Sequence, residues 1–316
     1  MAGNSTGVVV AALVANGLIA VLKFVGFLLT GSPAMLSETY HSISDTGNQV
    51  LLLVGIRYGR RDPDRRHPFG YGKAQFFYSF LVSVLLFGIA GWESAKHGYD
   101  ALVHGGHGGP RTATLPLLNV QFDAVLVNYA VLLGAILFEA YAFRKAHAEI
   151  RRQMERNGWE SYREAFRSTS DVTTLTALTE DTIALSGAGI ALAGIYLTRT
   201  TGNPVYDAAS ALLIGLMLMG FAVALAWENK RLLLGESLPE HNEAELRAIV
   251  AEWDGVTEVV DFRTVFFGPG RILVTADVAF DDDLDTGAID ERITAMEAAL
   301  QEAESHVRKV YVEPEV

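Results

Sequence analysis

Two short stretches place ionisable side chains within apolar sequence, at a spacing that suits metal binding. The first, SETYHSISDTGNQ, carries His41 and Asp45 four residues apart. On a helix, residues four apart lie on one face, one turn from each other. Imidazole and carboxylate groups bind borderline divalent metals such as zinc, but a tetrahedral ion needs about four ligands. His41 and Asp45 therefore predict part of a metal site.

The second stretch, TALTEDTIALSG, carries the adjacent carboxylates Glu180 and Asp181. Adjacent residues on a helix point about 100° apart, so one carboxylate can face the His41–Asp45 pair while the other faces a neighbouring helix or a water-filled cavity. Taken singly, each of these side chains could instead cap a helix or snorkel towards water. Four such residues in two apolar segments favour a site, and we predict that all four bind metal.

Six apolar stretches are long enough to cross about 30 Å of hydrocarbon, which needs about 20 helical residues. An ionisable group at that depth is costly and by default marks a site or a pathway. We predict that Lys23 snorkels or pairs with an acid, and that Asp207 is a favourable charge at a helix N-terminus. The predicted spans are 7–30, 36–58, 76–103, 119–143, 173–198 and 205–227.

Lysine and arginine concentrate in alternate loops between these spans. Six lie between residues 57 and 73, seven between 144 and 167, and two more directly follow the last span, whereas the other loops hold few. Because basic loops stay on the cytoplasmic side, we expect an integral membrane protein with both termini in the cytoplasm.

The last 88 residues read as a separate acidic domain. Residues 1–228 carry 17 acids and 17 bases, whereas residues 229–316 carry 20 acids and 8 bases, so the net charge of −12 lies in the tail. Its pattern of helix, two strands, helix and strand indicates a small α+β sandwich. An acidic domain disfavours nucleic acid as a partner. The absence of cysteine excludes disulfides and thiolate metal sites.

With these residues in view, the chain resembles a known family, the cation diffusion facilitators, which are zinc-transporter-like proton antiporters. The resemblance rests on TGSPAMLSETYHSISDTGNQ, on RRDPDRRHPFGYGKAQFFYSF, on the six spans and on the tail ending VRKVYVEPE. It implies a six-span bundle with a cytoplasmic ferredoxin-like domain. It also implies a homodimer in the lipid bilayer that exchanges a divalent transition metal for protons. Such a protein is not an enzyme and needs no cofactor, since the metal is its substrate.

The family's transport site is a pair of H/D-x-x-x-D motifs in spans 2 and 5. The first motif falls on His41 and Asp45. In the second, Asp181 matches, but Ala177 stands where zinc-specific members usually have histidine, and the chain offers Glu180 instead. The segment STSDVTTLTALTEDTIALSG, together with FEAYAFRKAHAEI, is similar to the branch related to the mitochondrial zinc transporter, which tends to have this Glu–Asp pair.

We therefore predict export of metal from the cytoplasm by proton antiport, with zinc as the first choice. One imidazole with two or three carboxylates is a harder ligand set, which leaves manganese, iron(II) and cobalt open. Two other classes compete: a membrane-anchored metal sensor that transports nothing, and an intramembrane hydrolase that uses Glu180 and Asp181. The sequence contains neither an HExxH motif nor a nucleophile elbow, which argues against the hydrolase. We expect the tail to serve dimerisation. The Arg- and Ala-rich composition without an organelle-targeting stretch favours a prokaryotic plasma membrane.

Overall fold

The computed structural model describes residues 2–105, 112–115, 120–157, 161–162 and 172–315. The chain divides into two compact units, one comprising 1–51 and 81–226 and the other 52–80 and 227–316. The second segment of the latter unit begins at residue 227, two residues before the domain boundary predicted at 229. That unit also includes residues 52–80, which the sequence analysis counted with the membrane domain.

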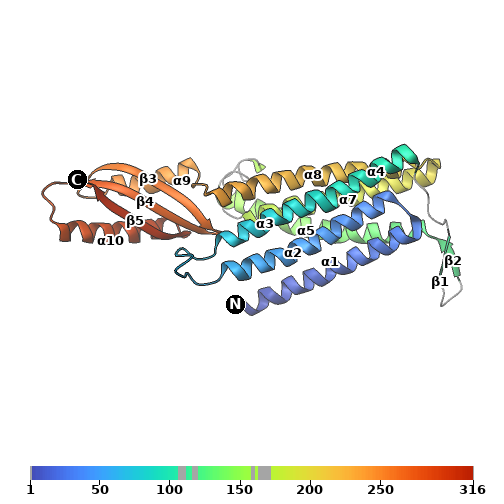
Figure 1. Cartoon of the computed structure of the whole chain (residues 1–316), viewed down its shortest axis with the longest axis horizontal. Helices are drawn as coiled ribbons and strands as arrows, with labels where there is room; N and C mark the ends of the chain where they lie inside the picture. Colours follow the sequence, from blue (N-terminus) through green and yellow to red (C-terminus); the bar gives the residue numbers. More distant parts are fainter. Residues whose placement is uncertain (1, 106–111, 116–119, 158–160, 163–171, 316) are drawn as a thin grey trace. The chain divides into compact units, whose positions relative to one another are not determined.

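Long helices fall on all six predicted spans (Figure 1). The third span is continuous from α3 through η1, a single π-helical turn, into α4. The bounds are α1 (Ala2–Thr30), α2 (Pro33–Gly59), α3 (Lys73–Leu85), η1 (Leu86–Gly91), α4 (Trp92–His104), α5 (Val125–Asn157), α7 (Val172–Thr201) and α8 (Val205–Leu234).

Hydropathy alone identifies four of these segments among the described residues as long and apolar enough to cross a membrane. They are Lys73–His104, Val125–Glu155, Leu178–Thr201 and Val205–Leu234. In α1 the apolar part found is the shorter segment Asn16–Thr30. The helix α2 is not among them, because charged and amide side chains interrupt its apolar sequence. The helix that carries His41 and Asp45 is thus less apolar than a typical membrane span.

Small residues bring the helices of the first unit close together. Buried alanines of α2, α7 and α8 pack with Leu132 of α5 and Ile214 of α8 in one core. A β-carbon on Gly98 of α4 would lie 2.3 Å from the backbone nitrogen of Leu212, so the backbones of α4 and α8 are in close contact. Such close contacts are typical of helices packed in membranes, where association depends on van der Waals packing.

Between α4 and α5 lies an antiparallel hairpin of β1 (Thr112–Leu115) and β2 (Val120–Asp123). The predicted start of the fourth span at residue 119 was wrong, because residues 120–123 pair as a strand. The helix α5 starts at Val125, whose backbone nitrogen donates to the Asp123 carboxylate.

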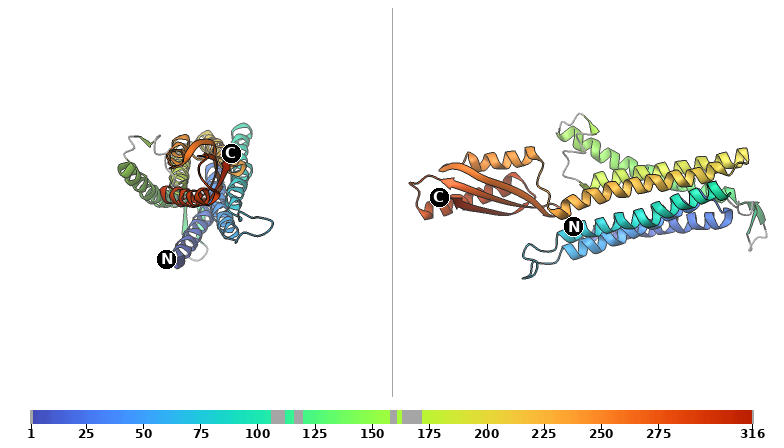
Figure 2. Two further views of the ribbon diagram at one scale, coloured as in Figure 1. Left: turned by 90° about the vertical axis from the view of Figure 1, so that its left-hand side faces the viewer. Right: turned by 45° about the horizontal axis from the view of Figure 1, so that its top comes forward.

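The second unit contains a three-stranded sheet with two helices on one face (Figure 2). The strand order is β3-β4-β5, with β3 and β4 antiparallel and β4 and β5 parallel. Alternate β4 residues from Ile272 to Phe280 are buried against both helices, as period-two alternation predicts. The predicted αββαβ order is confirmed. The elements are α9 (Glu240–Ala251), β3 (Val256–Gly268), β4 (Arg271–Phe280), α10 (Thr286–Ala303) and β5 (Val307–Glu315).

The basic loop between α2 and α3 belongs to the same unit and is organised around Asp64. The Asp64 carboxylate accepts hydrogen bonds from the Tyr71 hydroxyl at 2.7 Å and from the backbone nitrogens of Arg66 and His67 at 2.8 and 2.7 Å. These bonds, the tyrosine's foremost, hold the pKa of Asp64 below its ordinary value. Gly72 then leaves room for the backbone of Phe267, whose oxygen would lie 2.7 Å from a β-carbon there.

Candidate metal-transport site

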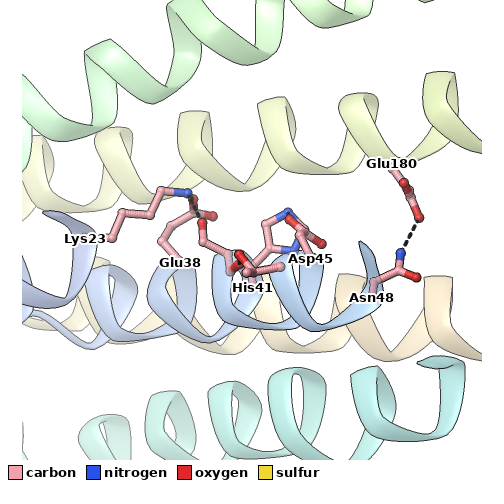
Figure 3. Close-up of polar contacts among 8 residues, drawn as sticks. Lys23, Glu38, His41, Asp45, Asn48 and Glu180 are labelled. Atoms are coloured by element: carbon pink, nitrogen blue, oxygen red, sulfur yellow. Dashed lines mark hydrogen bonds and ion pairs between the residues drawn. The ribbon is translucent and has the colours of Figure 1, made fainter. Parts of the chain in front are cut away.

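Four polar side chains form a stripe along one face of α2 (Figure 3). Glu38, His41, Asp45 and Asn48 follow each other at intervals of three, four and three residues. That spacing keeps them on one side of a helix with 3.6 residues per turn. The stripe places the two predicted ligands of α2 between two further polar groups, which the sequence analysis did not select.

His41 and Asp45 lie together at the middle of the stripe. His41 Nε2 is 3.5 Å from Asp45 Oδ2, and the two side chains are 5% and 32% exposed. Both ring nitrogens of His41 are buried without a hydrogen-bond partner. Charges close enough to act on this pair come from Lys23, Glu38, Glu139 and Asp181. A buried imidazole with two unused nitrogens beside a carboxylate can accept a cation, because buried polar groups are otherwise almost always paired.

Glu180 approaches the stripe from α7 one turn beyond Asp45, and its neighbour Asp181 lies close enough for its charge to act on Asp45. Asn48 Nδ2 donates a 2.9 Å hydrogen bond to Glu180 Oε1 (Figure 3). Within the part of the chain that the structure describes, no three His, Asp or Glu side chains lie close enough to hold one metal ion. The predicted set of His41, Asp45, Glu180 and Asp181 is therefore held as separate groups, and their joint binding of metal stays a prediction.

The other end of the stripe is a buried ion pair. Lys23 Nζ of α1 lies 2.7 Å from Glu38 Oε2 and donates a further hydrogen bond, at 2.9 Å, to Ser42 Oγ. Of the two fates expected for Lys23, the structure shows the second, pairing with an acid. Sequence reasoning missed Glu38, although its position three residues before His41 was a signal that could have found it.

A comparison with protein-family models matches residues 9–234 to the cation efflux transmembrane domain. The chain belongs to the cation efflux family. The matched segment runs from within α1 to the end of α8. With the apolar helices, this makes the chain a membrane protein, and it confirms the resemblance to the cation diffusion facilitators.

The relatives of this cation efflux protein include eukaryotic and bacterial transporters. It is 32% identical to the mitochondrial proton-coupled zinc antiporter SLC30A9 of Homo sapiens over 87% of this chain and 46% of that protein. It is 27% identical to metal tolerance protein C4 of Arabidopsis thaliana over 89% of this chain and 58% of the relative. The Escherichia coli cation-efflux pump FieF is 26% identical over 84% and 77%. The chain spans less than half the length of the mitochondrial antiporters, and its predicted place in their branch is confirmed.

In this cation efflux protein the start of α2 is fixed by a residue of α8. Asp207 Oδ1 accepts hydrogen bonds from Ser32 Oγ at 2.9 Å and from the Ala34 backbone nitrogen at 3.2 Å. Asp207 lies in the first turn of α8, as predicted, but it caps α2 as well. A carboxylate at a helix N-terminus satisfies free amides and complements the helix dipole. Asp207 thus anchors the helix that carries His41 and Asp45.

Proposed function

We propose that this protein exports divalent transition metals, zinc foremost, from the cytoplasm in exchange for protons. Manganese, iron(II) and cobalt are the alternative substrates. The proposal is supported by membership of the cation efflux family and by relatives whose names describe a zinc antiporter and an efflux pump. The single observation that carries it is His41, whose two buried ring nitrogens have no hydrogen-bond partner, next to the Asp45 carboxylate.

In this proposal the metal draws together side chains that are apart in its absence. His41 and Asp45 supply one imidazole and one carboxylate from α2, and Asp181 and Glu180 supply carboxylates from α7. Glu180 must exchange its hydrogen bond from Asn48 for the metal. A ligand set with one nitrogen and several oxygens fits zinc or the harder ions that precede it in the divalent series.

Proton exchange follows from the same ligands. Metal binding requires neutral imidazole and ionised carboxylates, so it releases any protons that these groups hold. Protonation on the opposite side of the membrane weakens the site and releases the metal, after which the protein returns carrying the protons. Alternating access of a site near the middle of the bilayer is the usual transporter solution.

We further propose that both termini face the cytoplasm, so that α2 begins at the outer, non-cytoplasmic side. The basic loops at 57–73 and 144–167 support this orientation. We also propose that the chain is a homodimer joined through its acidic C-terminal domain, in a prokaryotic plasma membrane.

The decisive experiment is flux in proteoliposomes that contain a pH-sensitive dye. Zinc, manganese, iron(II), cobalt and cadmium are added in turn to the wild-type protein, to Asp45→Ala and to Asp100→Ala. Asp100 is an exposed carboxylate of α4 and serves as the matched control. We expect proton movement with zinc for wild type and Asp100→Ala and none for Asp45→Ala. Exchange by Asp45→Ala at the wild-type rate would refute the site. No response to any metal would refute the transport function and favour the sensor.

A further inference from the structure

The ion pair between Lys23 and Glu38 is among the most deeply buried features of the first unit. The two side chains are 3% and 0% exposed. Among the residues whose burial the structure describes, Lys23 is the only lysine or arginine that is buried. A buried ion pair rarely adds net stability, because desolvating the charges costs about as much as their attraction returns. Its presence beside a cation site therefore calls for a functional explanation.

Glu38 also lies against α7, at Gly187, where a larger side chain would press on the Glu38 carboxylate. A β-carbon on Gly187 would lie 2.6 Å from Glu38 Oε1. That oxygen is buried and has no hydrogen-bond partner, whereas Lys23 Nζ donates to the other oxygen. The carboxylate thus lies between Lys23 of α1 and the backbone of α7.

Exposure rises steadily along α2 away from this contact. The Glu38 side chain is 0% exposed, the His41 side chain 5% and the Asp45 side chain 32%. Glu38 lies nearer to the start of α2 than the two predicted ligands do, on the outer side in the proposed orientation (Figure 3). The pair of predicted ligands, His41 and Asp45, is therefore covered on its outer side and more exposed towards the other end of the helix.

We propose that Lys23, Glu38 and Gly187 form an outer plug that closes the transport pathway above His41 and Asp45. Lys23 is a positioning residue in this plug: it neutralises Glu38, so the carboxylate can stay out of water against α7. Opening the pathway outward separates α2 from α7 at Gly187 and exposes the pair to water. The plug rests on the proposed transport function and orientation.

The charges predict an unusual pattern of variants. Lys23→Met leaves a buried carboxylate unpaired, and Glu38→Gln leaves a buried ammonium unpaired. Either lone charge gains by reaching water, so each single variant favours the outward-open form. The double variant Lys23→Met/Glu38→Gln carries no charge at this level, so the plug should stay closed. Lys23→Arg keeps the pair and should behave as wild type.

The test uses the absence of cysteine from the chain, which makes one introduced thiol the only one present. The reporter is Asp45→Cys in this chain, exposed in right-side-out or inverted membrane vesicles to a membrane-impermeant maleimide. Labelling rates are compared in the native, Lys23→Met, Glu38→Gln, double and Lys23→Arg backgrounds. Lys96→Met and Glu93→Gln, singly and together, are the matched control on α4.

We expect each single variant to raise labelling from the outer side by about tenfold or more, since losing one partner of a buried pair is worth at least that factor. The double variant, Lys23→Arg and the α4 controls should stay within about twofold of the native background. Equal outer labelling in every background would overturn the plug, and so would a double variant as reactive as the singles. If Lys23→Met fails to fold, Glu38→Gln carries the same test.

Labelling does not depend on transport, so the two proposals can fail separately. Wild-type protein that exchanges no metal for protons would refute the proposed function and leave the labelling pattern to decide the plug. Intact exchange with equal labelling in all backgrounds would refute the plug alone.

Discussion

Adding one methyl group at Gly187 should destabilise the protein, whereas the same change two residues further along α7 should not. Both glycines lie in α7, so replacement by alanine brings each the same intrinsic gain, about 1 kcal/mol in a helix. Nothing lies within 4 Å of a β-carbon on Gly189, but a β-carbon on Gly187 would lie 2.6 Å from Glu38 Oε1. Close carbon–oxygen contacts in proteins settle at about 3.3 Å or more, so the carboxylate or the helix must move.

The size of the effect depends on which group gives way. If α7 shifts, the cost is that of overpacking, about 1–3 kcal/mol. If Glu38 turns away, its bond to Lys23 is lost and the cost rises to about 3–5 kcal/mol. Gly187→Ala should therefore be less stable than Gly189→Ala by at least about 1 kcal/mol. The measurement is denaturation in one detergent, followed by the fluorescence of the four tryptophans. Equal stability of the two variants would show that Glu38 does not pack on α7 as described.

Three further predictions concern other polar contacts. Asp207→Ala should lower the free energy of unfolding by about 2–4 kcal/mol in the same assay, because it removes a helix cap and leaves buried donors without an acceptor. Asp207→Asn keeps an acceptor and should cost less than half as much. Equal losses for the two variants would contradict the cap. Asn48→Ala should tighten zinc binding up to about fivefold by calorimetry, since Glu180 no longer gives up a hydrogen bond worth about 1 kcal/mol; weaker binding would count against Glu180 as a ligand. Tyr71→Phe should raise the pKa of Asp64 towards its ordinary value of about 3.9. The ionised carboxylate orders the loop, so on acidification the variant should lose this order at a higher pH than the wild type does. An NMR titration of the Asp64 carboxyl carbon that shows one pKa for both proteins would refute this.

The fold could be predicted because its signals are local. Long apolar runs locate the helices, and the alternation from Ile272 to Phe280 locates the central strand of the C-terminal sheet. The short hairpin of β1 and β2 escaped because four-residue strands carry too little pattern to outweigh an apolar run that continues into α5. The helix α2 was predicted in spite of its polar residues, since those residues were themselves the signal of a site.

The site could be predicted only in part, because the sequence of one helix does not determine how far α7 is shifted along α2. The spacing of His41 and Asp45 placed both on one face of α2, and the structure holds them 3.5 Å apart. Whether Glu180 meets Asp45 or Asn48 depends on how far α7 slides along α2, which packing at positions such as Gly187 decides. Asn48 and Glu38 were overlooked because neither stands at a position of the family's H/D-x-x-x-D motif.

The two contacts that flank the metal pair on α2 differ in strength, and this difference bears on how the pathway opens. In the proposed orientation, Glu38 lies on the outer side of the pair, where it is fully buried against α7 and bonded to Lys23. On the inner side, the bond between Asn48 and Glu180 is a single, partly buried hydrogen bond, worth about 1 kcal/mol. Parting α2 from α7 at the inner end breaks one such bond, whereas parting them at the outer end must also hydrate an ion pair. In the absence of metal the inner end should therefore open more readily, which is the arrangement an exporter needs in order to load from the cytoplasm.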